Sequence, residues 1–237
     1  MNQKLHTKYP AISDLARKAK RRIPHFAWEY LDSGTGIEDC VPRNRAAFSD
    51  ITLVPKFMQG AFEPDICTSL FGVDYDMPFG VAPVGLTGLM WPGAEKILAK
   101  AAAQHRIPYG LSTVATEAPE TIGPLTDGMG WFQLYPPRLP ELRKDLLKRA
   151  KESGFTTLMV TADVPTGSRR ERQTRAGVTV PPKTGLRTIF HASLRPHWTL
   201  ETLRYGQPAF RGLEKYIDGK DIQTKKLILE FVKIIHY

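Results

Sequence analysis

Four short apolar segments alternate with helix-like segments between residues 77 and 163. The apolar segments cover residues 78–84, 107–113, 130–135 and 157–163, and each has the length of a buried strand. Strands that alternate with helices pair in parallel. The pattern therefore predicts a parallel α/β sheet whose strand ends meet at one edge.

Two of the intervening segments have the pattern of helices that cover a sheet. Residues 92–106 begin with proline, and residues 139–153 are followed by Gly154, a common residue just beyond a helix end. The residues expected to face inward are Ile97, Leu98 and Ala101 in the first helix and Leu142, Leu146, Leu147 and Ala150 in the second.

The residues before the sheet form a separate predicted region. Residues 10–31 have apolar positions at helical spacing. Residues 50–76 are rich in proline, phenylalanine and glycine, which favours loops and a hairpin. We interpret this region as a cap that precedes the sheet.

Two folds are consistent with the alternation, an open doubly wound sheet and a TIM (β/α)8 barrel. A doubly wound dinucleotide-binding fold has a GxGxxG turn after its first strand, and Val-Gly-Leu-Thr-Gly at 84–88 matches it poorly. In a barrel, ligand-binding groups follow the strands, as they do after all four segments here. We therefore predict a truncated barrel, with residues 1–76 as the helical cap and loops, 77–212 as about four βα units, and 213–237 as a divergent C-terminal tail.

The composition is that of a globular protein inside a cell. Of the 237 residues, 42% are hydrophobic, which is enough for a core. No apolar run reaches the roughly 20 residues of a membrane helix, and residues 1–22 lack the apolar centre of a secretory signal. Cys40 and Cys67 are too far apart for a zinc cluster or a redox pair, so we expect no metal site and a cytoplasmic location.

The net charge of +9 is compatible with nucleic acid, an anionic membrane or anionic ligands as partners. No nucleic-acid-binding motif is present, so we expect no nucleic-acid partner. Residues 186–204 mix three arginines with apolar side chains. This mixture is typical of a partly buried loop, which we favour, and also of a peripheral contact with the inner face of the membrane.

Polar or small residues follow each predicted strand. Ser112, Gln133 and Thr161 end the second, third and fourth strands. One such residue alone is more often a satisfied core group, but several together favour a ligand with alternating donors and acceptors, such as the pyrimidine edge of a flavin. After the first strand, Val84 and Gly85 either leave the backbone accessible to a flat ring or form a plain tight turn.

Further side chains suit a substrate with a carboxylate or a hydroxyl group. Tyr30 and Tyr135 carry phenol groups, although a buried tyrosine whose hydroxyl reaches the surface is the commoner case. Arg169 and Arg170 follow the fourth strand, where a guanidinium binds a carboxylate through two hydrogen bonds. We expect one of these arginines to be a solvated charge.

These residues lie in motifs that resemble the FMN-dependent 2-hydroxy acid dehydrogenases and oxidases. Six segments occur in the family's order between about residues 12 and 212, and they are most similar to the bacterial L-lactate and mandelate dehydrogenases. The segments are EYLDSG at 29–34, NRAAF at 44–48, AP at 82–83, WFQLY at 131–135, TADVP at 161–165 and RRE at 169–171.

The resemblance implies an enzyme that uses FMN to oxidise a small L-2-hydroxy acid such as lactate to the 2-oxo acid. It also implies a homo-oligomer for the full-length family and leaves the electron acceptor open. The residues implied to contact FMN are Val84, Gly85, Ser112, Gln133 and Thr161, and those implied to contact substrate are Tyr30, Tyr135 and Arg170. A histidine removes the substrate's proton in such enzymes, and Asp163 matches the aspartate that orients it.

Part of the family pattern is absent from the sequence. The family's base lies in a His-Gly-Gly-Arg segment between a strand-end lysine and the phosphate-binding residues, and none of these segments occurs here. We therefore expect weak FMN binding and no activity from the chain alone. A frameshift or premature stop is our explanation for the tail, and a helix over the exposed sheet edge is the alternative.

A second hypothesis for the function is a non-catalytic remnant, or a half-barrel that binds another half-barrel. The open edges of half a barrel carry unpaired backbone groups, which favour self-association.

Overall fold

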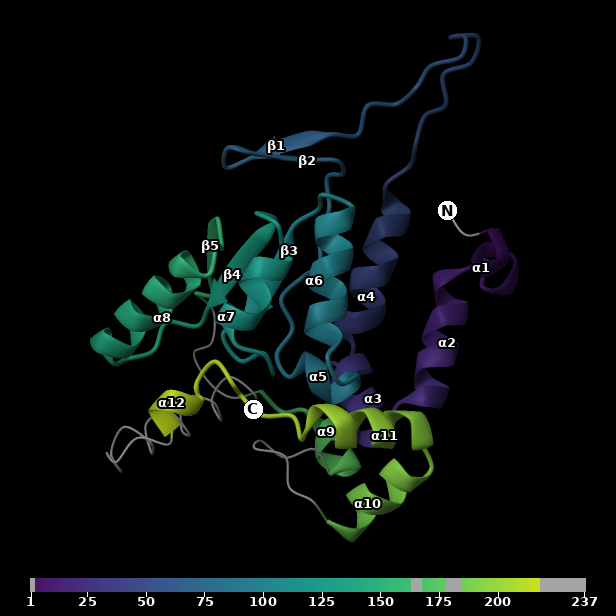
Figure 1. The fold of residues 1–237 in the computed structure, drawn as a ribbon. Coiled ribbons are helices and arrows are strands. Elements are labelled where there is room, and N and C mark those ends of the chain that lie inside the picture. Colours follow the sequence, from purple (N-terminus) through teal and green to yellow (C-terminus); the bar gives the residue numbers. More distant parts are fainter. Residues whose placement is uncertain (1–2, 163–167, 178–184, 218–237) are drawn as a thin grey trace.

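The computed structural model describes residues 3–162, 168–177 and 185–217 (Figure 1). The helices expected over residues 10–31 are confirmed as α2 Ile12–Arg22 and α3 His25–Asp32, and α1 Gln3–Lys8 precedes them. Proline at position 24 separates α2 from α3, because it lies at the residue before α3 in an extended conformation. Helix α4 Cys40–Ala46 and the 3-10 helix η1 Ala47–Asp50 complete the cap.

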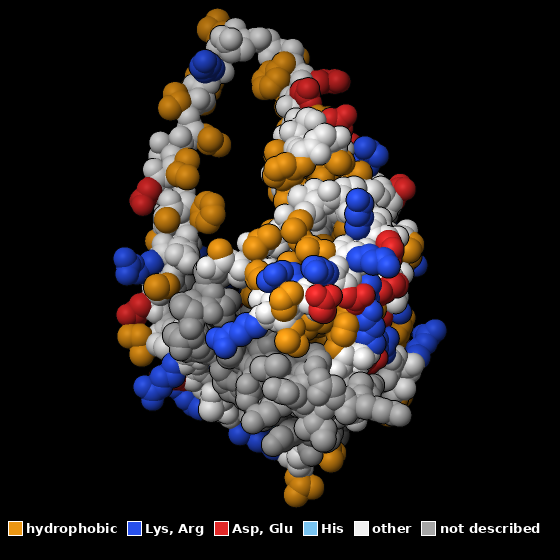
Figure 2. Space-filling model, turned by 90° about the vertical axis from the view of Figure 1, so that its left-hand side faces the viewer, with side chains coloured by type: hydrophobic (Ala, Val, Ile, Leu, Met, Phe, Trp, Pro, Cys, Tyr) orange, Lys and Arg blue, Asp and Glu red, His pale blue; other side chains and the backbone are white. Residues whose placement is uncertain are grey.

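Residues 51–67, which we call the arm, project from the body together with a hairpin (Figure 1). Strand β1 Thr68–Leu70 pairs antiparallel with β2 Val73–Tyr75, so the expected hairpin is confirmed. Figure 2 shows the arm as part of an arch with apolar side chains along it. Leu53, Val54, Phe57 and Met58 are each at least 80% exposed. The arm thus carries apolar surface that no described residue covers.

Three parallel strands form the sheet, in the order β3 Tyr109–Ser112, β4 Gly130–Leu134 and β5 Thr157–Val160. The segment 78–84 lies beside β3 but forms only an isolated bridge, between Val81 and Tyr109. Pro78 and Pro83 lack the backbone N–H that a regular ladder needs. Three of the four predicted strands are therefore confirmed as strands, and the first is reduced to a bridge.

Helices α6 Ala94–Gln104 and α8 Pro140–Glu152 are both present, but only α8 buries the face that its apolar spacing predicted. Leu142, Leu146 and Ala150 are buried on α8 as expected. The prediction for α6 was wrong for Ile97 and Ala101, which are exposed, whereas Leu98 is partly buried against the core as expected. The fully buried residues of α6 are Glu95, Ala99 and Ala102. The two alanines bring α6 close to the sheet, and hydrogen bonds to Oε1 compensate part of the burial of Glu95, whose Oε2 is buried without a partner among the described residues. Three short helices complete this part of the chain. Helix α5 Thr87–Met90 precedes α6, and α7 Pro119–Ile122 and the 3-10 helix η2 Gly123–Leu125 lie between β3 and β4.

Glu95 holds two chain segments together inside the body. Its Oε1 accepts hydrogen bonds from the backbone N–H of Thr116 at 3.0 Å and of Gly88 at 3.2 Å, and from the Thr116 hydroxyl. The side chain has no solvent exposure. A buried acceptor of this kind fixes the start of α5 against the segment that follows β3, because unpaired N–H groups would be costly there.

The described residues after the sheet form α9 Glu171–Ala176, α10 Leu186–Ser193, α11 Pro196–Tyr205 and α12 Glu214–Ile217. The loop that we favoured for residues 186–204 is therefore wrong, since two helices occupy this segment. Proline at position 196 is the first residue of α11, where its missing N–H costs nothing. Within the described ranges, no helix has the length and apolar character needed to cross a bilayer. The predicted tail helix lies largely among residues 218–237, outside the described residues.

Arg172 joins α9 to the cap. Its guanidinium lies 2.5 Å from Glu29, 3.0 Å from Asp32 and 3.1 Å from Glu38. The Arg172 side chain is 29% exposed, so this network is better shielded from solvent than an ordinary surface ion pair. It holds α3 and the start of the following loop against α9, whose residues lie more than a hundred positions away in the sequence.

Glu95→Ala should lower the free energy of unfolding by about 2–3 kcal/mol, because a buried N–H that loses its acceptor costs about 1–3 kcal/mol. Glu95→Gln retains one acceptor oxygen, so we expect about half that loss or less. Urea unfolding followed by circular dichroism measures both. Glu141→Gln, on the exposed first turn of α8, is the control and should change stability by less than about 0.5 kcal/mol. A Glu95→Ala protein as stable as this control would contradict the role of Glu95.

Arg172→Gln should lower the free energy of unfolding by about 1–3 kcal/mol, because three carboxylates lose a shared cation. Arg175 is the matched control on the same helix, since its ion pair with Glu171 is largely exposed. Arg175→Gln should cost less than about 0.5 kcal/mol in the same urea experiment. Equal losses in the two variants would rule out a special role for Arg172.

The same network predicts a loss of stability in acid. The Gly34 N–H and then Arg172 hold the pKa of Glu38 below its ordinary value of 4.5. A carboxyl whose pKa is lowered by folding stabilises the protein above the unfolded pKa and loses that contribution as the pH falls through the folded pKa. Stability should therefore fall below about pH 4.5. Urea titrations from pH 7 to 3 should show a smaller fall in Arg172→Gln than in the unchanged protein.

Candidate active site

Three side chains at the carboxyl ends of the strands form a continuous hydrogen-bonded ladder. Ser112 and Gln133 face each other in the β3–β4 register, and the Ser112 hydroxyl donates to Gln133 Oε1 at 2.9 Å. Gln133 Nε2 in turn donates to the Thr161 hydroxyl, just beyond β5, at 2.6 Å. The structure therefore brings together the three residues predicted from the strand ends. Ser112 and Gln133 are each only 5% exposed, so the ladder holds them in fixed orientations.

Thr113 connects this ladder to the chain that leaves β4. Its hydroxyl donates to the Gln133 carbonyl at 2.6 Å and accepts from the Tyr135 N–H at 3.2 Å. Thr113 was not among the site residues predicted from the sequence. Its position directly after Ser112, at a strand end, was the available signal.

A cavity of about 310 Å³ lies beside the ladder, between the cap helix α3 and the strand ends. Five of the predicted site residues line it, from four separate parts of the chain. The lining residues are Tyr30, Leu31, Ser33, Pro83, Val84, Gly85, Val114, Tyr135 and Arg170. The Val114 N–H donates to the Ser112 hydroxyl at 3.3 Å, which ties the cavity wall to the ladder.

The turn at residues 83–86 is held rigidly at the edge of this cavity. The Tyr30 hydroxyl donates to the Gly85 carbonyl at 3.1 Å, and the Leu86 N–H donates to the Val114 carbonyl at 2.9 Å. Leu86 has a φ of +51°, in the left-handed region that favours glycine, and its side chain has no solvent exposure. A leucine is held in this conformation only when its surroundings stabilise it, as they often do at ligand sites. Nothing in the sequence marks Leu86 as strained.

Tyr30 and Arg170 combine a neutral donor with a positive charge. Burial raises the pKa of the Tyr30 phenol well above its ordinary value of 10, and the nearby charge of Arg170 offsets only part of that effect. The phenol is therefore protonated at neutral pH and donates a hydrogen bond. The backbone of Tyr30 is held as well, because the Gln173 amide on α9 donates to its carbonyl at 3.3 Å.

The two consecutive arginines have different surroundings. Arg169 is 88% exposed beside Glu171 and is the solvated charge that we expected. Arg170 lines the cavity, its Nε donates to the Ser168 hydroxyl at 3.2 Å, and it forms no ion pair within the described parts of the chain. Its charge therefore favours an anionic ligand in the cavity.

Asp163 lies outside the described residues, so its predicted role stays a prediction. The histidines in the described ranges are His6, His25, His105, His191 and His197, and none of them lines the cavity.

The donors and acceptors present fit a flavin ring. Gln133 keeps one N–H and part of the acceptor capacity of its carbonyl oxygen beyond the two bonds of the ladder. The backbone of Gly85 lies at the cavity wall without a Cβ, where a flat ring can approach it. A flat ring could pack against the backbone of Gly85, and the nearby carboxamide and hydroxyl groups could bond to its polar edge. A few polar groups beside a mostly apolar surface are typical of small-molecule and cofactor sites.

Residues 19–232 match the protein family described as FMN-dependent dehydrogenase. The chain is 37% identical over 206 residues to a putative L-lactate dehydrogenase of Mycobacterium tuberculosis, covering 86% of this chain and 50% of that protein. An L-lactate dehydrogenase of Ectopseudomonas mendocina is 37% identical over 198 residues, which cover 84% of this chain and 52% of the relative. The chain thus spans about half the length of the curated relatives it matches.

Solved structures agree with this assignment. The structure of (S)-mandelate dehydrogenase, described as a monotopic membrane protein, superimposes with a TM-score of 0.82 at 26% identity over 93% of this chain and 58% of that chain. A soluble mutant of the membrane-associated (S)-mandelate dehydrogenase from Pseudomonas putida matches with a TM-score of 0.68 at 30% identity, over 77% of this chain and 55% of that one. The predicted α/β fold, part of a TIM barrel, is confirmed. The chain belongs to the family of FMN-dependent dehydrogenases.

Proposed function

We propose that this chain supplies the flavin-facing and substrate-facing first half of an enzyme that oxidises a small L-2-hydroxy acid, such as lactate, to the 2-oxo acid. The observation that carries the proposal is the cavity beside the ladder, which collects Tyr30, Val84, Gly85, Tyr135 and Arg170. These residues come from the cap, the first βα turn, the end of β4 and the loop before α9. Their convergence on one small space supports a shared ligand.

FMN, when bound, would accept two electrons and the α-hydrogen of the substrate. Ser112, Gln133 and Thr161 would hold the edge of its ring, because the ladder fixes the Gln133 carboxamide in one orientation. Val84 and Gly85 would contact the face of the ring. The role of these residues is to position the ring, and they carry no proton in the reaction.

Arg170 would bind the substrate carboxylate, since its charge faces the cavity without a carboxylate partner in the described residues. Tyr30 and Tyr135 would orient the carboxylate and the 2-hydroxyl group through their phenols. Tyr30 would turn its single O–H from the Gly85 carbonyl to the substrate. The raised pKa of Tyr30 favours this role, because a phenol that stays protonated can donate to an anion and cannot act as a base at neutral pH. The proton of the 2-hydroxyl group therefore needs another acceptor.

That acceptor would be a histidine held by Asp163, and the sequence contains no His-Gly-Gly-Arg segment to supply it. We propose that residues 1–76 form the cap, 77–212 the first half of the barrel and 213–237 a divergent tail. The remaining elements of the site would then come from a second half, and the complete enzyme would be a homo-oligomer. Strand β5 is consistent with this proposal, because Leu158 and Val160 on it are 46% and 58% exposed.

A half-barrel that binds another half-barrel without catalysis is the second candidate. The exposed residues of β5 and the apolar arm support it, since both are exposed apolar surfaces that a partner could cover. The two candidates differ in whether the cavity beside the ladder binds a small carboxylate.

We further propose that α10 and α11 contact the inner face of a membrane from the cytoplasmic side. The match to the monotopic (S)-mandelate dehydrogenase covers more of this chain than the match to the soluble mutant does. Leu186, Ile189, Phe190, Leu200 and Leu203 on these helices are each more than half exposed. Apolar side chains interspersed with arginines are typical of helices that lie in a membrane surface.

The isolated chain should be colourless after purification and should not oxidise L-lactate when FMN and a dye acceptor are added. The reason is that the base histidine and the phosphate-binding segment are missing from the sequence. Flavin absorbance and dye reduction measure the two expectations. Turnover above that of free FMN would contradict the proposed division of the site.

Oxalate, a planar dicarboxylate, should bind the chain through Arg170, and Arg170→Gln should weaken this binding at least about tenfold, as expected for losing a charge-assisted pair of hydrogen bonds. Arg169→Gln is the matched control and should bind as the unchanged chain does, because its guanidinium is exposed. Isothermal titration calorimetry measures the affinities. Equal losses in both variants would indicate a nonspecific charge effect and would favour the non-catalytic candidate.

A further inference from the structure

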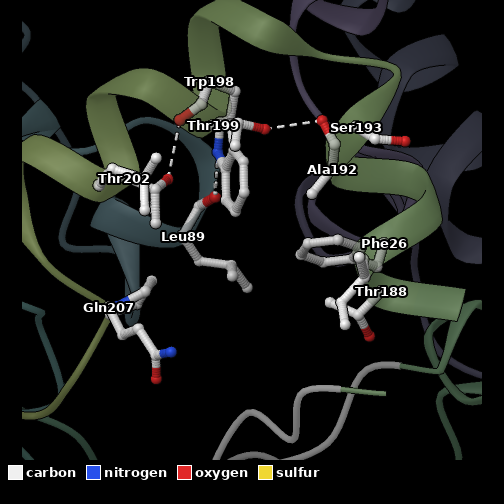
Figure 3. Close-up of a pocket in the computed structure, with 12 residues that line it drawn as sticks. Phe26, Leu89, Thr188, Ala192, Ser193, Trp198, Thr199, Thr202 and Gln207 are labelled. Atoms are coloured by element: carbon white, nitrogen blue, oxygen red, sulfur yellow. Dashed lines mark hydrogen bonds between the residues drawn. The ribbon is translucent and has the colours of Figure 1, made fainter. Parts of the chain in front are cut away.

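A second cavity, of about 360 Å³, lies away from the strand ends, where α10 and α11 pack over α3 and α5 (Figure 3). Figure 3 shows Phe26, Leu89, Ala192 and Trp198 around a shared space, with Gln207 at its edge. The full set of lining residues is Phe26, Leu89, Thr188, Ile189, Ala192, Ser193, Trp198, Thr199, Thr202, Leu203, Gln207 and Pro208. Its volume lies within the range of about 300–1,000 Å³ that is typical of small-molecule sites.

The cavity has a buried floor and an exposed apolar mouth. Phe26, Leu89 and Trp198 are between 4% and 8% exposed. The Phe26 and Trp198 rings pack edge to face, with their centres 5.8 Å apart. Ile189 and Leu203 also line the cavity but are 57% and 76% exposed. The exposed apolar mouth therefore lies at α10 and α11 and leads to the aromatic floor.

Four of the six polar side chains that line the cavity are bonded to the backbone, and Thr188 and Gln207 are the other two. The hydroxyls of Ser193, Thr199 and Thr202 donate to carbonyls of α10 and α11 at 2.7–2.8 Å. The Trp198 Nε1–H donates to the Leu89 carbonyl at 3.1 Å. Because these donors are already used, few polar groups remain to bond a ligand. The cavity therefore favours a hydrocarbon ligand over a polar one.

Three arginines lie on or between the same two helices, although none of them lines the cavity. Arg187, Arg195 and Arg204 lie within residues 186–205, where Glu201 is the one acidic residue in the sequence. None of the three arginines pairs with a carboxylate in the described part of the chain, although Arg187 and Arg195 bond to backbone carbonyls. An apolar mouth with unpaired cations complements a molecule that has a hydrocarbon chain and an anionic head.

We propose that this cavity takes one acyl chain of an anionic membrane phospholipid, whose phosphate lies among the arginines of α10 and α11. The proposal rests on the membrane contact proposed above and adds a defined site to it. A helix pair lying in the surface buries its apolar face about 5–10 Å deep. One chain that leaves the bilayer and enters the cavity would anchor the helices more specifically than surface contact alone.

Vesicles of phosphatidylglycerol with brominated acyl chains test the proposal, because bromine quenches tryptophan fluorescence only at short range. The full chain and Trp198→Phe are compared, so that the difference between them isolates Trp198 from the other three tryptophans. We expect the brominated vesicles to remove at least about half of this difference signal. Brominated phosphatidylcholine vesicles should remove much less of it, because they lack the anionic head.

Ala192→Phe fills the cavity and should abolish the quenching of Trp198, whereas vesicle binding, measured by sedimentation, is retained. Leu200→Phe is the matched control, since Leu200 lies on α11 outside the lining and is 62% exposed. A chain that sediments with vesicles but shows no quenching specific to Trp198 would overturn the acyl-chain site and leave the membrane contact standing. Failure to sediment would overturn both, and neither result affects oxalate binding, which tests the enzymatic proposal.

Discussion

Parallel pairing of three short strands is the constraint on which the rest of the structure depends. In this arrangement successive strands begin and end at the same edges, so the residues at the carboxyl ends of β3, β4 and β5 must lie close together. Ser112, Gln133 and Thr161 meet there as a hydrogen-bonded ladder. The cavity with Arg170 and the two tyrosines lies next to this ladder because the helical cap packs over the same edge.

The sequence pattern predicted the helices and strands whose formation depends mainly on neighbouring residues. The apolar strands and the buried face of α8 follow from periodicity, and the hairpin follows from local composition. The polar strand ends identified the ladder, and the chemistry of individual side chains together with the family resemblance identified five of the cavity residues. The choice of face on α6 could not be predicted, because it depends on a buried carboxylate whose acceptors lie in other segments. The helices at 186–205 were missed although Leu186, Ile189 and Phe190 have helical spacing, because the mixture of arginines and apolar residues was interpreted as a loop.

Long-range contacts account for the rest of what sequence reasoning left out. Arg172 looked like one more charge in an arginine-rich segment, and its three carboxylate partners are distant in the sequence. Leu86 has no feature that predicts a left-handed backbone, which arises from the packing around it. Such properties are set by which segments meet in space, and a single sequence carries no direct record of that.

The network around Arg172 has a consequence for the order in which the chain acquires its structure. The sheet and its helices are built from segments that are near one another in sequence, so all the partners of their contacts are present early in synthesis. Helix α3, by contrast, is synthesised early and meets its cation only after some 140 further residues have been added. The wall of the cavity that carries Tyr30 is therefore synthesised well before the arginine that holds it against α9.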